Sequence, residues 1–488
     1  MPKRLFRRKF LQQIIEDLDI QGHMLHRSLN AFDLTVLGVG AIVGVGIFVL
    51  TGTAAAKYAG PGIMLSLVIS GCACLFTALC YAEFASLMPV AGSAYNYAYA
   101  TLGEMIAWII GWDLILEYIV ACIAISIGWS GYFVNIMGSL GIQIPPWCAS
   151  APGTTPEAII NLPAILVVLS LTALLILGIK ESVRFTSLLV FIKLITVLVF
   201  VSVGMFNVKS ANWTPFLPYG FKGVMTGAAI IFFAYIGFDA ISTAAEETKD
   251  PQRNMPIGIL LSLLICTVLY ILVSAVLTGM VSYKELNHPA PVAHALNLVG
   301  YTWGSALVSV GALAGITSVL LVMLMGQPRI FFSMSRDGLL WPWIAKVHPR
   351  FRTPYVAQIL TGTVVALFAG FLDIGTAAEL CNIGTLFAFC IVCGGIVVLR
   401  QTHPEMKRSF RCPLVPLIPL LGICFCASLM LSLPQLTWIR FAIWLIAGLT
   451  IYFFYGILYV PGRHELALLY IDDLFCFCRF SDQIRLPG

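Results

Sequence analysis

Twelve apolar windows, each long enough to cross a lipid bilayer and poor in charged residues, dominate the sequence. They lie near residues 32–56, 62–88, 101–129, 160–180, 185–208, 219–245, 256–282, 301–332, 354–372, 376–400, 413–434 and 438–460. Only 10% of the 488 residues are charged, whereas soluble domains carry about 25% charged residues. So few charges cannot cover a soluble surface. The sequence therefore predicts an all-α integral membrane protein with twelve transmembrane helices, and it excludes disordered, fibrous and nucleic-acid-binding classes.

The distribution of lysine and arginine orients these windows. If the chain starts inside, the segments predicted to be cytoplasmic hold 22 of the 28 basic residues and the external segments hold 5. Basic residues concentrate on the cytoplasmic side of membrane proteins. We therefore expect a multi-pass protein of the cell (cytoplasmic) membrane with both termini cytoplasmic. Residues 1–31 form its N-terminal tail and residues 461–488 its C-terminal tail.

Two of the windows contain residues that weaken a helix. Four glycines fall among the nine residues of Gly38–Gly46, and the sixth window places Gly237 and Asp239 in mid-span; each glycine costs about 1 kcal/mol in a helix. The two windows are five helices apart, so they occupy matching positions in two halves that enter the membrane from opposite sides. Such paired breaks indicate a transporter with its binding site at the bilayer midplane. The alternative is that the glycines only let two helices pack closely.

The two breaks also predict the chemistry of the ligand. Where the first helix restarts at Gly44–Gly46, free N–H groups and the positive end of the helix dipole suit a carboxylate. Free carbonyls at the ends of the first half-helices suit an ammonium group, especially those of Ile42, Phe233, Ala234 and Ile236. Donors and acceptors in one cavity describe an α-amino acid, and a sugar or fatty acid would not use both ends.

Lys193 is the only charged residue in the window 185–208, and it lies in the middle of that span. A lysine at the centre of a membrane span costs about 2.5–3.5 kcal/mol to insert into the bilayer. We therefore expect Lys193 to have a functional role. Glu117 on the third helix is its natural partner, with Asp113 one turn earlier. The pair is either a static buried ion pair or a proton-coupling site in which Lys193 gains and loses a proton. We expect the proton as the coupling ion, with sodium as the alternative, and no metal site or cofactor. Asp239 is expected to hold the unwound segment by hydrogen bonds.

Several separate motifs resemble the amino acid–polyamine–organocation (APC) superfamily. They are Gly40–Phe48, Met88–Tyr95, Gly237–Asp239 with its continuation to Pro256, and Met334–Leu340. Together with Gly111–Tyr118, they are similar to the cationic amino acid transporter branch and its bacterial homologues. The likeness covers about residues 30–460.

The resemblance implies a five-plus-five inverted repeat (LeuT-like, or APC, fold) with discontinuous helices 1 and 6. Its parts are repeat 1 (32–208), repeat 2 (219–400) and two extra helices (413–460). It implies that the backbone amides of Val43, Gly44, Val45 and Gly46 hold the substrate carboxylate. Phe233 also closes the outer path as a gate, and Lys193, linked to Glu117, stands where relatives bind sodium.

Met323 departs from this pattern, because eukaryotic cationic members have a small residue there. A bulky side chain shortens the pocket and favours small or neutral amino acids. The sequence thus predicts a proton-coupled importer of α-amino acids, working by alternating access and not an enzyme. Its partners are the amino acid and the lipid bilayer, and a small accessory membrane subunit is left open. The alternatives are a cationic amino acid or polyamine carrier or exchanger, a non-transporting amino acid sensor, and a channel.

Overall fold

The computed structural model describes residues 29–88, 93–177, 183–348 and 353–456. Within these ranges the chain is helical and forms no strand beyond two isolated bridges. The tails predicted at 1–31 and 461–488 lie outside the described residues, apart from 29–31.

The first half of the chain forms twelve helical segments in the described residues, with α marking α-helix and η marking 3-10 or π-helix. They are α3 (Ala31–Ile42), η1 (Gly46–Leu50), α4 (Thr51–Ala54), η2 (Ala55–Ala59), η3 (Gly60–Gly62), α5 (Ile63–Leu87), α6 (Ser93–Thr101), α7 (Glu104–Ser139), α8 (Pro146–Ala149), α9 (Leu162–Ile176), α10 (Val183–Met205) and η4 (Ser210–Trp213).

The second half continues in the same way. Its segments are α11 (Gly220–Ile231), η5 (Phe232–Tyr235), η6 (Asp239–Glu247), α12 (Pro251–Met280), η7 (Tyr283–Leu286), α13 (Pro291–Leu298), α14 (Thr302–Arg336), η8 (Pro342–Ala345), α15 (Tyr355–Phe371), α16 (Ile374–Thr402), α17 (Leu417–Leu431), α18 (Gln435–Ile451) and η9 (Tyr452–Gly456).

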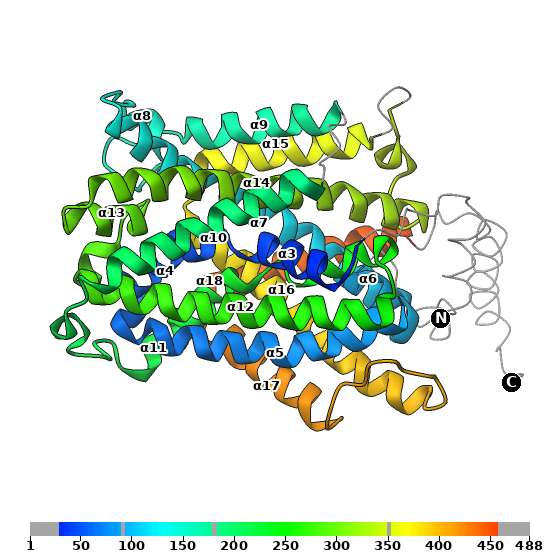
Figure 1. The fold of residues 1–488 in the computed structure, drawn as a ribbon. Coiled ribbons are helices and arrows are strands. Elements are labelled where there is room, and N and C mark those ends of the chain that lie inside the picture. Colours follow the sequence, from blue (N-terminus) through cyan, green and yellow to red (C-terminus); the bar gives the residue numbers. More distant parts are fainter. Residues whose placement is uncertain (1–28, 89–92, 178–182, 349–352, 457–488) are drawn as a thin grey trace, which may run out of the picture.

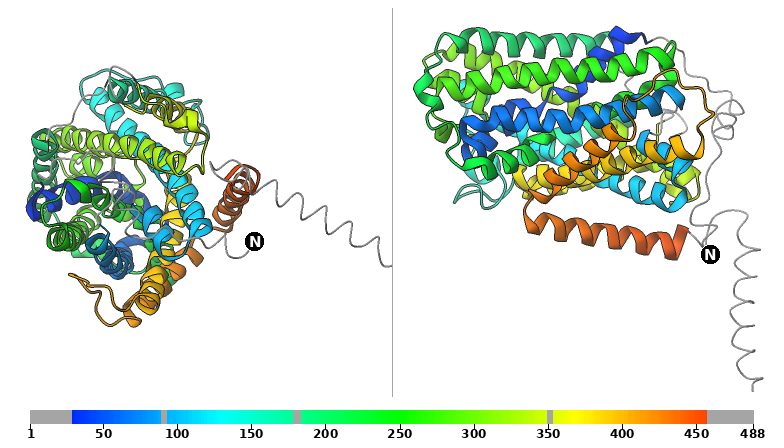
Figure 2. Two further views of the ribbon diagram at one scale, coloured as in Figure 1. Left: turned by 90° about the vertical axis from the view of Figure 1, so that its right-hand side faces the viewer. Right: turned by 90° about the horizontal axis from the view of Figure 1, so that it is seen from below.

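The long helices run roughly along one direction and form a single bundle (Figure 1). Helix α7 packs against α14 and α16, α5 packs against α12, and α9 lies beside α15. The short helices α8 and α13 gather at one end of the bundle, at the left in Figure 1. Figure 2 shows α17 and α18 on the outside of the bundle. We call the end with α8 and α13 the lid end; the basic residues predict that it is external.

Side chains fix where several helices begin. The Asn30 side chain accepts hydrogen bonds from the N–H groups of Phe32 and Asp33, and the Asp33 carboxylate accepts one from the N–H of Asn30. This capping box satisfies donors that would otherwise lack a partner at the start of α3. Asp373 caps α16 in a similar way, through the N–H groups of Gly375 and Thr376.

A buried ion pair ties α5 to the end of α16 opposite the lid. The Glu83 carboxylate is fully buried, and it accepts two hydrogen bonds from Arg400, of 3.0 and 2.8 Å, and one of 2.7 Å from the N–H of Cys412. Because a bidentate pair fixes both side chains, the connection from α16 to α17 is held against α5.

The prediction of an all-helical, membrane-type fold is confirmed. Eight described helices are long and apolar enough to cross a membrane, and four shorter apolar helices occur at 31–42, 162–176, 355–371 and 417–431. Each of the twelve windows predicted from the sequence contains helix. Twelve membrane crossings and the inverted repeat stay predictions.

Candidate functional site

Helix α3 breaks where its glycines predicted a break. It ends at Ile42, and Val43 takes an extended conformation with ψ of 101°. The chain resumes helical geometry at Val45 and continues as the π-helix η1. Since the first N–H groups of a helix have no acceptor within it, the restart at Val45 presents donors to the space beside the break.

A second break interrupts the helix that begins with α11. The chain tightens into η5, Ile236 is extended, and Gly237 has a φ of +118°, which favours glycine. A Cβ on Gly237 would lie 2.9 Å from the carbonyl oxygen of Ala41, and one on Gly46 would collide with the backbone of Ala234. The two breaks are therefore in direct backbone contact, and glycine is what permits it.

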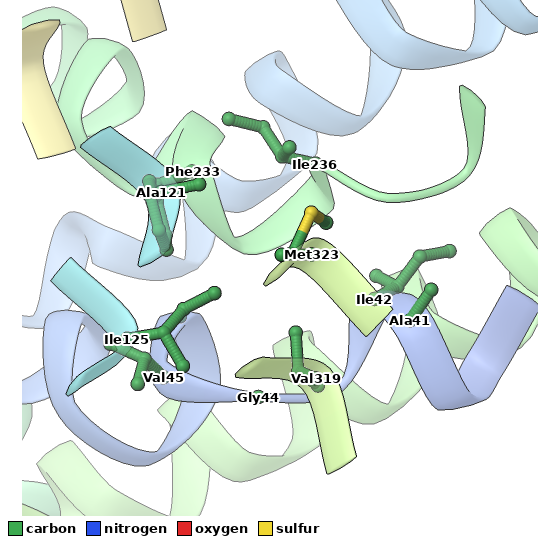
Figure 3. A pocket seen from close by; sticks show the side chains of 11 residues that line it. Ala41, Ile42, Gly44, Val45, Ala121, Ile125, Phe233, Ile236, Val319 and Met323 are labelled. Carbon is green, nitrogen blue, oxygen red and sulfur yellow. The ribbon is translucent and has the colours of Figure 1, made fainter. Parts of the chain in front are cut away.

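A pocket lies between the two breaks (Figure 3). Its walls come from the two broken segments, α7 and α14. The side chains in Figure 3 are carbon, apart from the sulfur of Met323. Polar contacts with a ligand here must therefore come from the backbone.

Most of the predicted binding residues lie around this pocket. Those that line it are Ile42, Gly44, Val45, Gly46, Phe233, Ile236 and Met323. Val43 and Ala234 are not among the lining residues, although both lie at the breaks. The lining residues that the sequence did not single out are Ala41, Ala121, Ile125 and Val319. Each is an apolar residue in an apolar helix, so no local signal marks it. The binding role of all these residues stays a prediction.

Tyr270 on α12 joins the two breaks. Its hydroxyl lies 2.8 Å from the carbonyl oxygen of Ile42 and 2.7 Å from that of Ala234. These are two of the carbonyls predicted to receive a substrate ammonium. A hydroxyl has one proton to share between two acceptors, so both carbonyls retain capacity for a further donor. The sequence signal that would have found Tyr270 is a buried hydroxyl in an apolar span, which needs an acceptor.

Lys193 lies against the end of α3 and is fully buried. Its ammonium donates to the carbonyl oxygen of Gly40, to that of Val43 at 3.0 Å and to the hydroxyl of Ser318 on α14 at 3.3 Å. The lysine thus holds the first broken helix and α14 together, directly beside the break.

The predicted pairing of Lys193 with Glu117 is wrong. In the described residues the ammonium of Lys193 is satisfied by the three oxygens above, whereas the Glu117 side chain lies against Thr385 on α16. The two residues face different neighbours because α10 packs on α3 and α14, while this face of α7 packs on α16. Asp113, one turn earlier, is also fully buried and lies beside Gly384 of α16.

Asp239 holds the second break, as predicted. Its carboxylate oxygen Oδ1 accepts a hydrogen bond of 3.2 Å from the N–H of Gly237. The bond spans the residue with the positive φ, and so it stabilises the sharp change in chain direction after Ile236.

A family model described as an amino acid permease matches residues 29–457. The chain belongs to this family. This confirms the resemblance to the APC superfamily, and the family consists of transporters rather than enzymes. The chain is thus a multi-pass membrane protein of an amino acid permease family.

The permease is similar to curated proteins over nearly its whole length. It is 49% identical to a methylthioribose transporter of Bacillus subtilis (strain 168), covering 93% of this chain and 98% of the relative. It is also 49% identical to a branched-chain amino acid permease of the same organism, with the same coverage. A vacuolar cationic amino acid transporter 4 of Arabidopsis thaliana is 37% identical over 78% of this chain and 65% of the relative.

Proposed function

We propose that the protein imports α-amino acids with small or neutral side chains, by proton symport and alternating access. The observation that carries the proposal is the pocket between the two breaks, whose side chains are apolar. Backbone N–H groups at the restart near Val45 suit the carboxylate, and the carbonyls of Ile42 and Ala234 suit the ammonium. The substrate side chain would then contact the apolar side chains that line the rest of the pocket, which are mainly aliphatic.

This apolar lining favours neutral over cationic substrates. Ala121, Ile125, Val319 and Met323 surround the space, and none of the lining residues is an acid. A buried ammonium or guanidinium without a partner is strongly unfavourable. The name of the branched-chain amino acid permease, a relative 49% identical, agrees with this preference.

We propose Lys193 as the proton-coupling residue. Its ammonium bonds to α3 directly before the break and to α14. Loss of its proton would leave two N–H groups for these three acceptors and remove the positive charge at the end of α3, and this couples its charge to the position of the broken helix. Glu117 remains a candidate for proton coupling by a route other than direct contact with Lys193.

The architecture proposed for this activity has twelve crossings with both termini cytoplasmic. Residues 32–208 and 219–400 are its two inverted repeats. The breaks in α3 and after α11 would then be the matched discontinuous helices of those repeats.

A methylthioribose carrier is the second candidate, because the relative with that name is equally similar. The pocket disfavours it, since the hydroxyl groups of a ribose have no polar side chain to bond within the lining residues.

Substrate competition in proteoliposomes separates these candidates. Vesicles loaded with unlabelled leucine would take up labelled leucine by counterflow, in the presence of valine, alanine, arginine, putrescine or methylthioribose. We expect valine and alanine to compete. Competition by arginine or putrescine would favour the cationic carrier, and competition by methylthioribose the sugar carrier. Leucine binding without any counterflow would favour a sensor.

A further inference from the structure

The connection between α12 and α14 covers the lid end of the bundle, and we call this connection the lid. It comprises residues 282–298, with η7 and α13, and α13 buries Pro291, Val292, Ala293, Ala295 and Leu296. Pro291 touches Gly52 of α4, which follows the first break. Pro289 presses on α7, where a Cβ on Gly131 would lie 2.8 Å from its carbonyl oxygen. The lid therefore joins the segment after the first break to the long helix α7.

Two histidines stack inside this lid. The rings of His288 and His294 have centroids 4.2 Å apart and planes within 6° of parallel. His288 precedes α13 and His294 lies on it. The Nδ1 of His288 accepts the N–H of Ala290 at 3.1 Å, and the backbone N–H of His294 donates to the carbonyl of Ala290 at 2.9 Å. Both rings are partly buried, so the fold of the lid itself sets their face-to-face contact.

We propose that the His288–His294 pair is an acid-sensitive latch: the lid stays closed while at most one ring is charged, and a second proton opens it. Two imidazolium rings face to face at 4.2 Å repel each other, and partial burial removes the water that would screen them. Because His294 lies on α13, we expect separation of the rings to shift α13 and to break the contacts of the lid with α4 and α7.

The charges around the pair support this assignment. Burial and then the neighbouring His294 lower the pKa of His288 from its ordinary 6.5 to about 4. The charged groups beside the lid include Lys57 on η2 and Lys284 and Glu285 on η7. The titratable hydroxyls there are those of Tyr58, Tyr283 and Tyr301, and that of Tyr132 on α7, which lies against Val292 and Ala293. The charge that acts on His288 is that of His294.

The sign of the pH dependence follows from linkage. His288 has the lower pKa when the lid is closed, and it regains a pKa near 6.5 when the rings separate. Protons therefore favour the open lid: the closed lid is fully stable above about pH 6.5 and loses stability as the pH falls toward 4. Between pH 7.5 and pH 5.0 the open-to-closed ratio should rise about 30-fold.

Opening of the latch would release the contact of Pro291 with Gly52, on the segment that follows the first break. The latch is separate from the proposed transport activity and does not depend on the identity of the substrate.

Hydrogen exchange measured by mass spectrometry tests the latch on the full-length protein in detergent or nanodiscs. Amide protection of the segment 286–298, corrected for the intrinsic effect of pH on exchange, reports lid opening. We expect the wild-type lid to lose protection about 30-fold between pH 7.5 and pH 5.0. The His288→Phe/His294→Phe variant keeps two stacked aromatic rings without protons, so its protection should change less than threefold.

The controls separate the latch from general effects of acid. His403→Phe, at an exposed histidine on the connection after α16, should behave like the wild type. His288→Phe alone should abolish the pH response, and it serves if the double variant does not fold. A wild-type lid with pH-independent protection, or a double variant that loses as much protection as the wild type, would overturn the proposal. The readout needs no transport, so failure of the latch and failure of the transport proposal are distinguishable.

Discussion

The ammonium of Lys193 lies 3.0 Å from the carbonyl oxygen of Val43, the residue at which α3 gives way to extended chain. A cation thus occupies the open end of a half-helix, where its charge complements the negative end of the helix dipole. Removal of the charge should change the free energy of the extended conformation at Val43.

Lys193→Met tests that coupling. Methionine keeps much of the side-chain length but donates no hydrogen bond, so the carbonyls of Gly40 and Val43 lose their donor. We expect uptake driven by a pH gradient to fall to background in proteoliposomes, that is by at least tenfold. Lys222→Met, at an exposed lysine on α11, is the control and should retain uptake. Accumulation at normal levels in the Lys193 variant would refute the coupling role.

Tyr270→Phe removes one hydroxyl and leaves the ring. Because two buried carbonyls, of Ile42 and Ala234, then lose a donor, we expect the protein to be destabilised by about 1–3 kcal/mol. We also expect substrate affinity to change together with transport rate, because one of these carbonyls belongs to Ile42, which lines the pocket. Thermal unfolding and the KM and kcat of uptake measure both effects. Tyr283→Phe, in the lid, is the matched control, and equal behaviour of the two variants would argue against a role for Tyr270 at the breaks.

Gly46→Ala tests the contact between the two breaks. The added methyl group would collide with the backbone of Ala234, and overpacking typically costs about 1–3 kcal/mol. We expect reduced thermal stability and loss of counterflow. Gly394→Ala adds a methyl group that meets nothing within 4 Å, so this variant should be neutral. Normal counterflow in Gly46→Ala would mean that the breaks do not need to touch.

Met323→Ser tests how side-chain size selects the substrate. Met323 is buried and lines the pocket, so a serine there should lengthen the space and admit longer side chains. A competition panel should show a gain for arginine and lysine over the wild type. Met325→Ser, two residues along the same helix, is the control. If arginine and lysine compete no better with the variant than with the wild type, the size of Met323 does not select the substrate.

The sequence predicts the breaks well because they rest on glycine. Four glycines in Gly38–Gly46, and Gly237 in the sixth window, leave a helix weak wherever they occur, and the structure has its breaks at Val43 and Gly237. Asp239 was also predictable, since an acid next to a break finds its N–H donors locally. These features depend on short stretches of chain.

The sequence does not predict which faces of distant helices meet. Opposite charge makes Glu117 the expected partner of Lys193, but the packing of α7 on α16 places Glu117 beside Thr385. Tyr270 and Val319 were missed for the same reason: their roles come from the helices opposite them. These contacts depend on how the helices pack. Hydrophobic periodicity does not predict that packing when nearly every residue of a helix is apolar.

The central claim is that the backbone at the two breaks holds both ends of an amino acid. Calorimetric titration of the purified protein with leucine, leucinamide and 4-methylpentanoate tests it most directly, because each analogue lacks one charged end. We predict that leucine binds and that both analogues bind at least 100-fold more weakly. An analogue that binds within threefold of leucine would contradict the account.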